Sequence, residues 1–191
     1  GELQLTDFGI SGIPVFQLSR YATKALKQKK KVHVLLDFMP DTELKELEKN
    51  MALRFRKNAH GKTAGEALIG LLNKKLSGVL LKEAGIDVHL PAQKVSDKQI
   101  HNLCTLIKGL RVDIIGSKTF EQAQVCAGGV STAEIENETL MSKLVPGLYF
   151  AGEVIDIDGI CGGYNLQWAW SSGYVAGLHA AGAATHSFSE M

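Results

Sequence analysis

The chain of 191 residues is long enough for one substantial domain or two small ones. Hydrophobic residues make up 45% of it and charged residues 21%, which is ordinary for a folded protein and excludes an intrinsically disordered chain. The 21 basic and 20 acidic side chains leave a net charge of +1, so charge gives no reason to expect a nucleic acid or an anionic membrane as partner. The apolar runs are too short to cross a bilayer, and we expect no membrane association.

The first forty residues predict a strand, a helix and a second strand. Glu2–Phe8 alternates apolar and polar residues, which is the period of a half-buried strand. Pro14 suits the first turn of a helix, and apolar residues recur at helical spacing until the basic run Lys27–Lys31 ends it. Val32–Phe38 is apolar and β-branched, and Pro40 stops it, so we expect a strand there.

Residues 42–108 predict a compact all-helical block. The expected helices are Glu43–Lys57 capped by Asp41 or Thr42, a helix from Thr63 to about Ala84, and one that begins at Ser96 or Asp97. Thr63 with Glu66 three residues later forms a capping box, and Gly85 is a natural stop because glycine adopts the left-handed C-cap conformation freely. The third helix should bury Ile100, Leu103, Cys104 and Ile107.

From Leu110 the apolar period changes to two. Arg111–Ile115 and Phe120–Val125 are expected as strands around a turn at Gly116–Ser117, and Leu148–Ala151 as a short buried strand that ends at Gly152. Asn165–Gly182 has helical spacing with many small residues. A strand, a glycine-bearing loop and a closely packing helix together predict the α/β class and the end of a cofactor-binding domain.

The residues around this last strand are suited to holding a nucleotide cofactor. Gly152 would let a ligand approach the backbone, and Glu153 offers a carboxylate to ribose or ribityl hydroxyls. Gly162 and Gly163 come directly before a helix whose first N–H groups and positive dipole end favour an anionic or electron-rich group.

The run from Gly147 to Gly177 resembles the C-terminal signature of a bacterial flavoprotein family, the NAD(P)/FAD-dependent oxidoreductases of the aminoacetone oxidase-like or BaiN/RdsA-like type. The blocks Gln124–Ser131 and Gly1–Gly12 resemble two further parts of that family, so the resemblance extends over essentially the whole chain. The family's Gly-x-Gly-x-x-Gly loop, which holds the FAD pyrophosphate, does not occur in this sequence.

The resemblance implies a division of the chain and a set of contacts. Residues 1–116 would be the latter part of an insert domain, and 117–191 would be the returning segment of a Rossmann-like FAD-binding domain whose N-terminal half is missing. Its implied cofactor-binding residues are Gly128, Gly129, Val130, Gly152, Glu153, Gly162, Gly163, Tyr164, Asn165, Leu166 and Gln167. The implied function is hydride transfer between a nicotinamide nucleotide, NAD(P)H, the flavin of FAD and an unidentified small-molecule substrate.

The sequence contains no residue whose pattern clearly indicates a catalytic acid or base. Asp156 and Asp158 could serve, although a solvated loop is an equally good interpretation. Cys126 and Cys161 are interpreted as small residues in tight loops, because no CxxC pair accompanies them. The odd number of cysteines argues against a disulfide scaffold and fits a reducing, cytoplasmic compartment, and the six histidines form no metal-ligand pairs, so no metal site is expected.

Two alternative functions remain open from the sequence. The chain could be an inactive folded module that serves as an interaction surface or lid. The helical block 42–108 could also be a nucleic-acid reader, but its Lys and Arg residues are scattered among Glu and Asp, which does not favour a phosphate-binding face.

Overall fold

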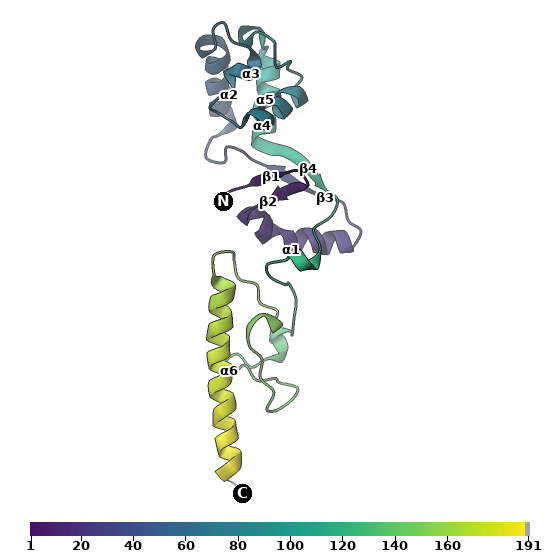
Figure 1. Ribbon diagram of the computed structural model, residues 1–191, viewed down its shortest axis with the longest axis vertical. Coiled ribbons are helices and arrows are strands. Elements are labelled where there is room, and N and C mark those ends of the chain that lie inside the picture. The colour runs from purple at the N-terminus through teal and green to yellow at the C-terminus, as the bar shows by residue number, and fades with distance from the viewer. Residues whose placement is uncertain (190–191) are drawn as a thin grey trace. The chain divides into compact units, whose positions relative to one another are not determined.

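A computed structural model describes residues 1–189 of the chain. It divides the chain into two compact units. One is Lys31–Ile115, and the other combines Gly1–Lys30 with the residues from Gly116 onward. Figure 1 shows the helices and strands of both units. The mixed helix and strand content confirms the α/β class, whereas the boundary between insert and cofactor domain stays a prediction.

The unit Lys31–Ile115 is a helical bundle closed by a two-stranded ribbon. Strands β3 (Val32–Leu36) and β4 (Leu110–Ile114) pair antiparallel, with Val32 opposite Ile114 and Leu36 opposite Leu110. The helical elements between them are α2 (Leu44–Leu53), a π-helical turn (Arg54–Asn58), α3 (Ala64–Ala67), α4 (Lys74–Glu83), a 3-10 turn (Ala92–Lys94) and α5 (Asp97–Gly109). The ribbon therefore brings the two ends of the unit together.

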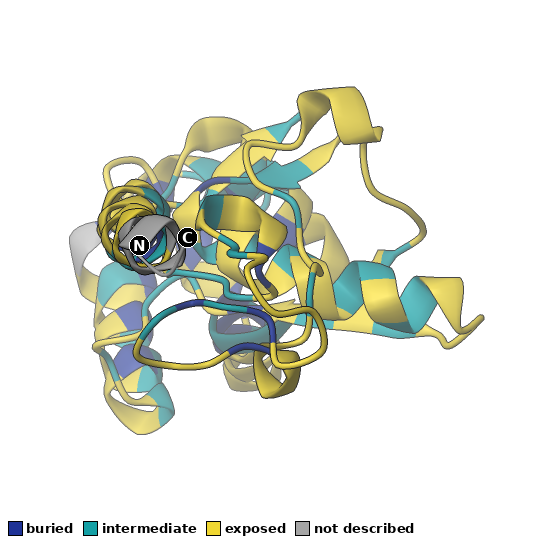
Figure 2. Cartoon of the chain, turned by 90° about the horizontal axis from the view of Figure 1, so that it is seen from below, coloured by how far each residue is buried: buried dark blue, intermediate teal, exposed yellow. Residues whose placement is uncertain are grey.

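The core of this unit lies between α2, α4 and α5. Figure 2 colours the chain by burial, with buried residues in dark blue. The largest fully buried side chains of this core are Met51, Phe55, Leu68, Leu80, Leu81, Leu103 and Ile107. Ile100, Leu103, Cys104 and Ile107 are all buried, which confirms the inward face predicted for the third helix. Removal of this apolar surface from water is the main stabilising contribution to the unit.

The local helix signals of this unit are confirmed. Thr63 accepts a hydrogen bond from the backbone N–H of Glu66, whose carboxylate accepts one from the N–H of Thr63 at 2.8 Å. Ser96 forms the same box with Gln99 and begins α5. Gly85 follows α4 with φ 71°, the left-handed conformation expected of it.

The prediction of a single helix from Thr63 to Ala84 is wrong, because the structure contains two helices in this stretch, α3 and α4. After α3 the chain turns at Gly70, where φ is 80°, and Asn73 caps α4 by accepting a hydrogen bond from the N–H of Lys75 at 2.9 Å. The guanidinium of Arg54 donates to the carbonyl oxygens of Ala67 and Ile69, at 2.5 and 2.6 Å. Those carbonyls would accept helical N–H groups in a continuous helix, so the arginine stabilises the break.

The helix expected at Glu43–Lys57 is also modified. It begins at Leu44 with Glu43 at the cap position and no side-chain capping bond, so neither Asp41 nor Thr42 caps it. Its last turn, Arg54–Asn58, widens to a π-helix.

The other unit begins with a small hairpin and a helix. Strands β1 (Gln4–Thr6) and β2 (Gly9–Ser11) pair antiparallel, and α1 (Ile13–Lys27) follows with Pro14 in its first turn. The remainder consists of 3-10 turns at Phe120–Gln122, Thr132–Glu134 and Gly152–Val154, and of the long helix α6 (Tyr164–Ser189). A small core is formed by Ile135, Leu140, Ile155 and Ala176.

Two strands expected in this unit are not formed among the described residues. Phe120–Val125 begins as a 3-10 turn with Phe120 79% exposed, and Leu148–Ala151 has only an isolated antiparallel bridge between Tyr149 and Met141. A strand requires a neighbour to take its backbone hydrogen bonds. The described residues supply no parallel neighbour strand for Leu148–Ala151.

Candidate cofactor site

The loop Gly128–Val130 lies directly against the segment that follows Gly152. The N–H of Val130 donates to the carbonyl of Val154 at 2.8 Å, and the N–H of Asp156 donates back to the carbonyl of Val130 at 3.0 Å. Gly129 has φ 155°, and a Cβ there would collide with the Val154 carbonyl oxygen. Glycine is therefore required at 129 for this close approach, whereas Gly128, with φ 101°, faces open space.

Glu153 joins the same two segments through its side chain. One carboxylate oxygen, Oε1, accepts a hydrogen bond from the backbone N–H of Cys126 at 2.6 Å. The residue is exposed, and Oε2 has no partner among the described residues. The carboxylate thus positions the loop before Gly128 with one oxygen and presents the other to solvent.

Gly152 is held on α6 by both of its backbone polar groups. Its N–H donates to Oγ of Ser172 at 2.8 Å, and its carbonyl accepts the indole N–H of Trp168 at 3.1 Å. Ser172 is 1% exposed, and its hydroxyl donates in turn to the Trp168 carbonyl at 2.6 Å. Gly152 has φ 73°, so the turn that carries Glu153 depends on a glycine and on this contact with the helix.

The start of α6 is shaped by two glycines and an asparagine. Gly162 and Gly163 have φ values of 128° and 92°; a Cβ on Gly163 would meet open space, whereas one on Gly162 would contact the Tyr164 ring at 3.9 Å. Oδ1 of Asn165 accepts the N–H of Gly159 at 2.8 Å, while its Nδ2 donates to the Gly159 carbonyl at 3.3 Å. This clamp folds the loop onto the helix, and the first N–H groups of α6 have no partners inside the helix.

The remaining predicted contacts lie on the first turns of α6. Tyr164 and Leu166 are 58% and 60% exposed, and the amide of Gln167 donates to the hydroxyl of Ser171 at 2.8 Å. The structure therefore connects the predicted residues into one continuous region, from the loop at Gly128 through Glu153 to the helix start. Their contact with a cofactor stays a prediction.

The chemistry of this region fits a flavin nucleotide. A carboxylate with a free oxygen suits ribityl or ribose hydroxyls, the open glycines at 128 and 163 permit close approach of a flat ring, and the helix N-terminus favours an electron-rich edge. A pyrophosphate would need further N–H donors of the glycine-rich loop type, which the sequence does not contain.

Three contacts of this region had no signal in the sequence. Ser172 and Trp168 lie within the predicted helix Asn165–Gly182, but their bonds to Gly152 and the bond from the Cys126 amide to Glu153 were not anticipated. Asp158 also forms an ion pair with Arg20 of α1, so one of the two acidic loop residues is partnered rather than solvated. Each contact joins residues that are far apart in sequence, and residue patterns do not encode such contacts.

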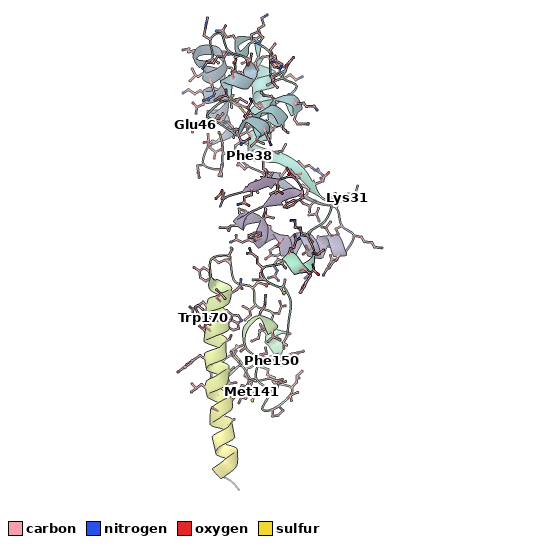
Figure 3. The ribbon with its side chains drawn as sticks, viewed as in Figure 1. Lys31, Phe38, Glu46, Met141, Phe150 and Trp170 are labelled. Atoms are coloured by element: carbon pink, nitrogen blue, oxygen red, sulfur yellow. The ribbon has the colours of Figure 1, made fainter. Side chains whose placement is uncertain are left out.

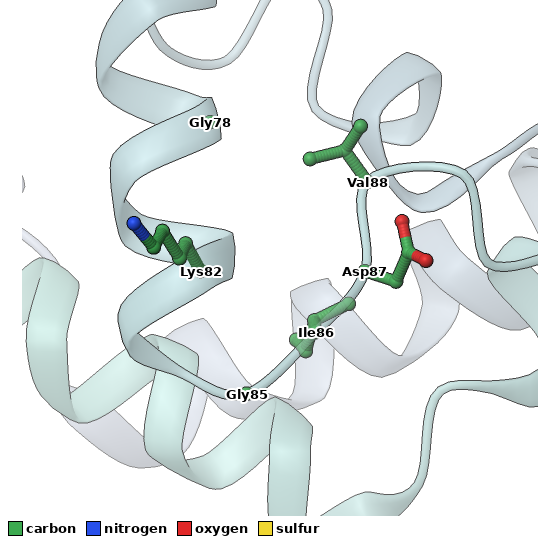
Figure 4. Close-up of a pocket in the computed structure, with 6 residues that line it drawn as sticks. All are labelled: Gly78, Lys82, Gly85, Ile86, Asp87 and Val88. Atoms are coloured by element: carbon green, nitrogen blue, oxygen red, sulfur yellow. The ribbon is translucent and has the colours of Figure 1, made fainter.

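A shallow hollow elsewhere in the molecule contains none of these residues. It measures about 420 Å³ and lies in the helical unit between α4 and the loop that follows it (Figure 4). Its lining residues are Gly78, Lys82, Gly85, Ile86, Asp87 and Val88. It therefore offers no alternative location for the predicted cofactor contacts.

Over the residues that the structure describes, no helix combines the length and the apolar character needed to cross a bilayer.

Comparison with known proteins identifies relatives over nearly the whole chain. The model of a family described as the HI0933-like protein Rossmann domain matches residues 11–179. The chain is 44% identical over 181 residues to a 3-dehydro-bile acid delta(4,6)-reductase of Clostridium scindens, a match that covers 95% of this chain and 44% of the relative. Ribosomal RNA dihydrouridine synthases of Haemophilus influenzae and Escherichia coli are 35% and 36% identical, with 93% and 90% of this chain and 41% and 40% of those relatives covered. The chain thus spans less than half the length of these curated relatives.

Proposed function

Because the chain belongs to the HI0933-like Rossmann domain family, we propose that it supplies one half of the FAD site of a flavin-dependent oxidoreductase. In this proposal Glu153 binds ribityl hydroxyls, and Gly128–Val130 with Gly162–Asn165 border the flavin ring. The observation that carries the proposal is the hydrogen-bonded junction of the Val130 loop, Glu153 and the start of α6. The pyrophosphate contacts, and any catalytic acid, belong to polypeptide that completes the domain.

The names of the relatives suggest the class of reaction. The names 3-dehydro-bile acid delta(4,6)-reductase and ribosomal RNA dihydrouridine synthase both denote the addition of hydrogen across a carbon–carbon double bond. We extend that class to this chain as part of the proposal: a hydride adds to one carbon of the double bond, and a proton adds to the other. Bound flavin would supply the hydride and would be reduced again by NAD(P)H.

The residues of this chain would act by positioning and electrostatics. The positive end of α6 would stabilise the negative charge that a flavin ring acquires on reduction. The anchoring of Gly152 by Ser172 and Trp168 would fix the turn that presents Glu153. The cytoplasm, where NAD(P)H is plentiful and thiols stay reduced, is the compartment that this chemistry and the free cysteines fit.

The test uses a chimera in which this chain replaces the matched 181 residues of the full-length Clostridium scindens relative. Glu153→Ala should weaken FAD binding about tenfold or more, because a charge-assisted hydrogen bond contributes roughly 1.5–3 kcal/mol. Glu153→Gln retains an oxygen that can accept the Cys126 N–H but removes the negative charge. It therefore separates the role of Glu153 in positioning the loop from the contribution of its charge to FAD binding. Glu134→Gln, an exposed carboxylate on another turn, is the matched control.

The apo-chimera is titrated with FAD, and binding is monitored through the fluorescence of the flavin. A chimera that binds no FAD would contradict the flavoenzyme proposal. FAD affinity that is equal for Glu153→Ala and the Glu134→Gln control would remove Glu153 from the site.

A further inference from the structure

Helix α6 has an unusual composition for a helix at a protein surface. No Asp, Glu, Lys or Arg occurs from Gly159 to Ser189. Surface helices of soluble proteins normally carry charged residues on the face that meets water, whereas helices that are apolar all round are buried. Burial within protein is therefore the environment that this composition suits.

One side of α6 is already buried within its own unit. Trp168 packs with Val175 and Ala176 against the core around Ile155, and Ser172 holds the turn at Gly152. These residues recur at the three- and four-residue spacing of one helix face. The chain's own packing therefore accounts for this side of the helix.

Another side of α6 is apolar and has no cover. Leu166, Trp170, Tyr174 and Leu178 follow one another at intervals of four residues and are 60%, 68%, 73% and 58% exposed. We call these four residues the open stripe; Trp170 is labelled in Figure 3. Successive members of such a series are neighbours along one helix face. Large apolar side chains in a continuous row indicate an interaction surface.

Two glycines in the same part of α6 agree with this interpretation. Gly173 and Gly177 lie in the helix interior, where glycine is less favourable than alanine. A Cβ at either position would meet no atom within 4 Å, so the packing of this chain does not require glycine there. A neighbour that approaches the helix closely would require it.

The family and the length of its members indicate what the neighbour is. The matching family model is that of a Rossmann domain, whose parallel sheet is covered by helices on both faces. The described residues contain only two antiparallel two-stranded ribbons. The relatives are more than twice as long as the part that this chain matches, so they have ample length for such a sheet.

We propose that the open stripe of α6 docks on the parallel sheet of the Rossmann domain, supplied by polypeptide that corresponds to the unmatched part of the relatives. The proposal rests on the half-site described under the proposed function, but docking itself does not require flavin. It assigns α6 two faces: one positions the turn of Glu153, and the other joins the two halves of the domain. The cofactor contacts of this chain would thereby be placed opposite the pyrophosphate loop.

The experiment compares four variants in the isolated chain and in the chimera defined above. Trp170→Glu and Gly173→Leu change the open side of α6. Val79→Glu and Gly78→Leu are matched controls on α4, where Val79 is 51% exposed and a Cβ on Gly78 would also meet open space. In the isolated chain we expect all four to shift the thermal midpoint by no more than about 2 °C. In the apo-chimera the two α6 variants should lower it by about 5 °C or more, or abolish soluble expression, while the controls should not.

Equal shifts for α6 and α4 variants in the chimera would overturn the proposal. Sedimentation velocity of the isolated chain tests whether a second copy of the chain covers the open stripe instead. A dimer that Trp170→Glu dissociates would assign the stripe to that second copy and overturn docking on the sheet.

If the chimera is insoluble, this chain and the unmatched part of the relative are co-expressed as separate chains with a tag on one. Co-purification lost in the α6 variants supports the proposal, and failure of the unmodified chain to co-purify overturns it. A chimera that shows the α6-specific shifts but binds no FAD would refute the flavin proposal alone.

Discussion

Replacement of Ser172 by alanine tests whether α6 positions the turn that carries Glu153. The hydroxyl of Ser172 is 1% exposed and accepts the Gly152 N–H at 2.8 Å. In Ser172→Ala that N–H loses its partner in a region closed by Trp168, whose indole holds the carbonyl of the same glycine. Leaving a buried donor unsatisfied costs about 1–3 kcal/mol.

The expected effect is a lower stability of the unit that contains α6. With a urea dependence of roughly 2 kcal/mol per M, the loss corresponds to a midpoint shift of about 0.5–1.5 M. Tryptophan fluorescence is the suitable probe, because both tryptophans of the chain, Trp168 and Trp170, lie in α6. The helical unit Lys31–Ile115 contains no tryptophan and therefore contributes no tryptophan fluorescence to this measurement.

Ser171→Ala is the matched control. Ser171 is the neighbouring residue of the same helix, is exposed, and receives one side-chain hydrogen bond from Gln167. Alanine improves helix propensity equally at both positions, so the difference between the two variants isolates the bond to Gly152. A midpoint for Ser172→Ala within about 0.2 M of the control, or an unchanged rate of hydrogen exchange at the Gly152 amide, would refute the reasoning.

Three further measurements test the helical unit and the thiols. Hydrogen bonds from the backbone N–H and the hydroxyl of Thr63 hold the pKa of Glu66 below its usual 4.5, so the folded state gains stability above that pH and loses it as the pH falls through the lowered pKa. Circular dichroism melts should therefore show the advantage of the wild type over Glu66→Gln disappearing in acid; an advantage independent of pH would contradict the assignment. Burial raises the pKa of Cys104 to about 12, so mass spectrometry after alkylation should find exposed Cys161 modified in the native protein and Cys104 only after unfolding. Phe55→Ala should destabilise the helical unit by about 3–5 kcal/mol in urea unfolding followed by circular dichroism, because Phe55 is fully buried; a loss below about 1 kcal/mol would mean that the core is not as described.

Features that depend on neighbouring residues in the chain were predictable from the sequence. The capping box of Thr63, the stop at Gly85 and the inward face around Leu103 all arise from groups within one or two helical turns. The break after α3 was not predictable in this way, because it is stabilised by Arg54, which lies 13 residues before Ala67 and on another element. The strand expected at Leu148–Ala151 failed for a related reason, since apolar character predicts a strand only where a partner strand is present.

The features of the candidate site likewise separate into those predictable from the sequence and those that only the tertiary structure shows. The residue types and their order by themselves predicted that Gly152, Glu153 and the glycines before α6 belong to a cofactor site, because glycine's conformational freedom and a carboxylate beside it are local properties. The tertiary structure alone decided that the Val130 loop lies against Val154, that Ser172 and Trp168 hold Gly152, and that one side of α6 remains open. Those contacts depend on which segments meet in space. A pattern along the chain specifies which groups could bind one another, whereas the packing of the helix determines which of them do.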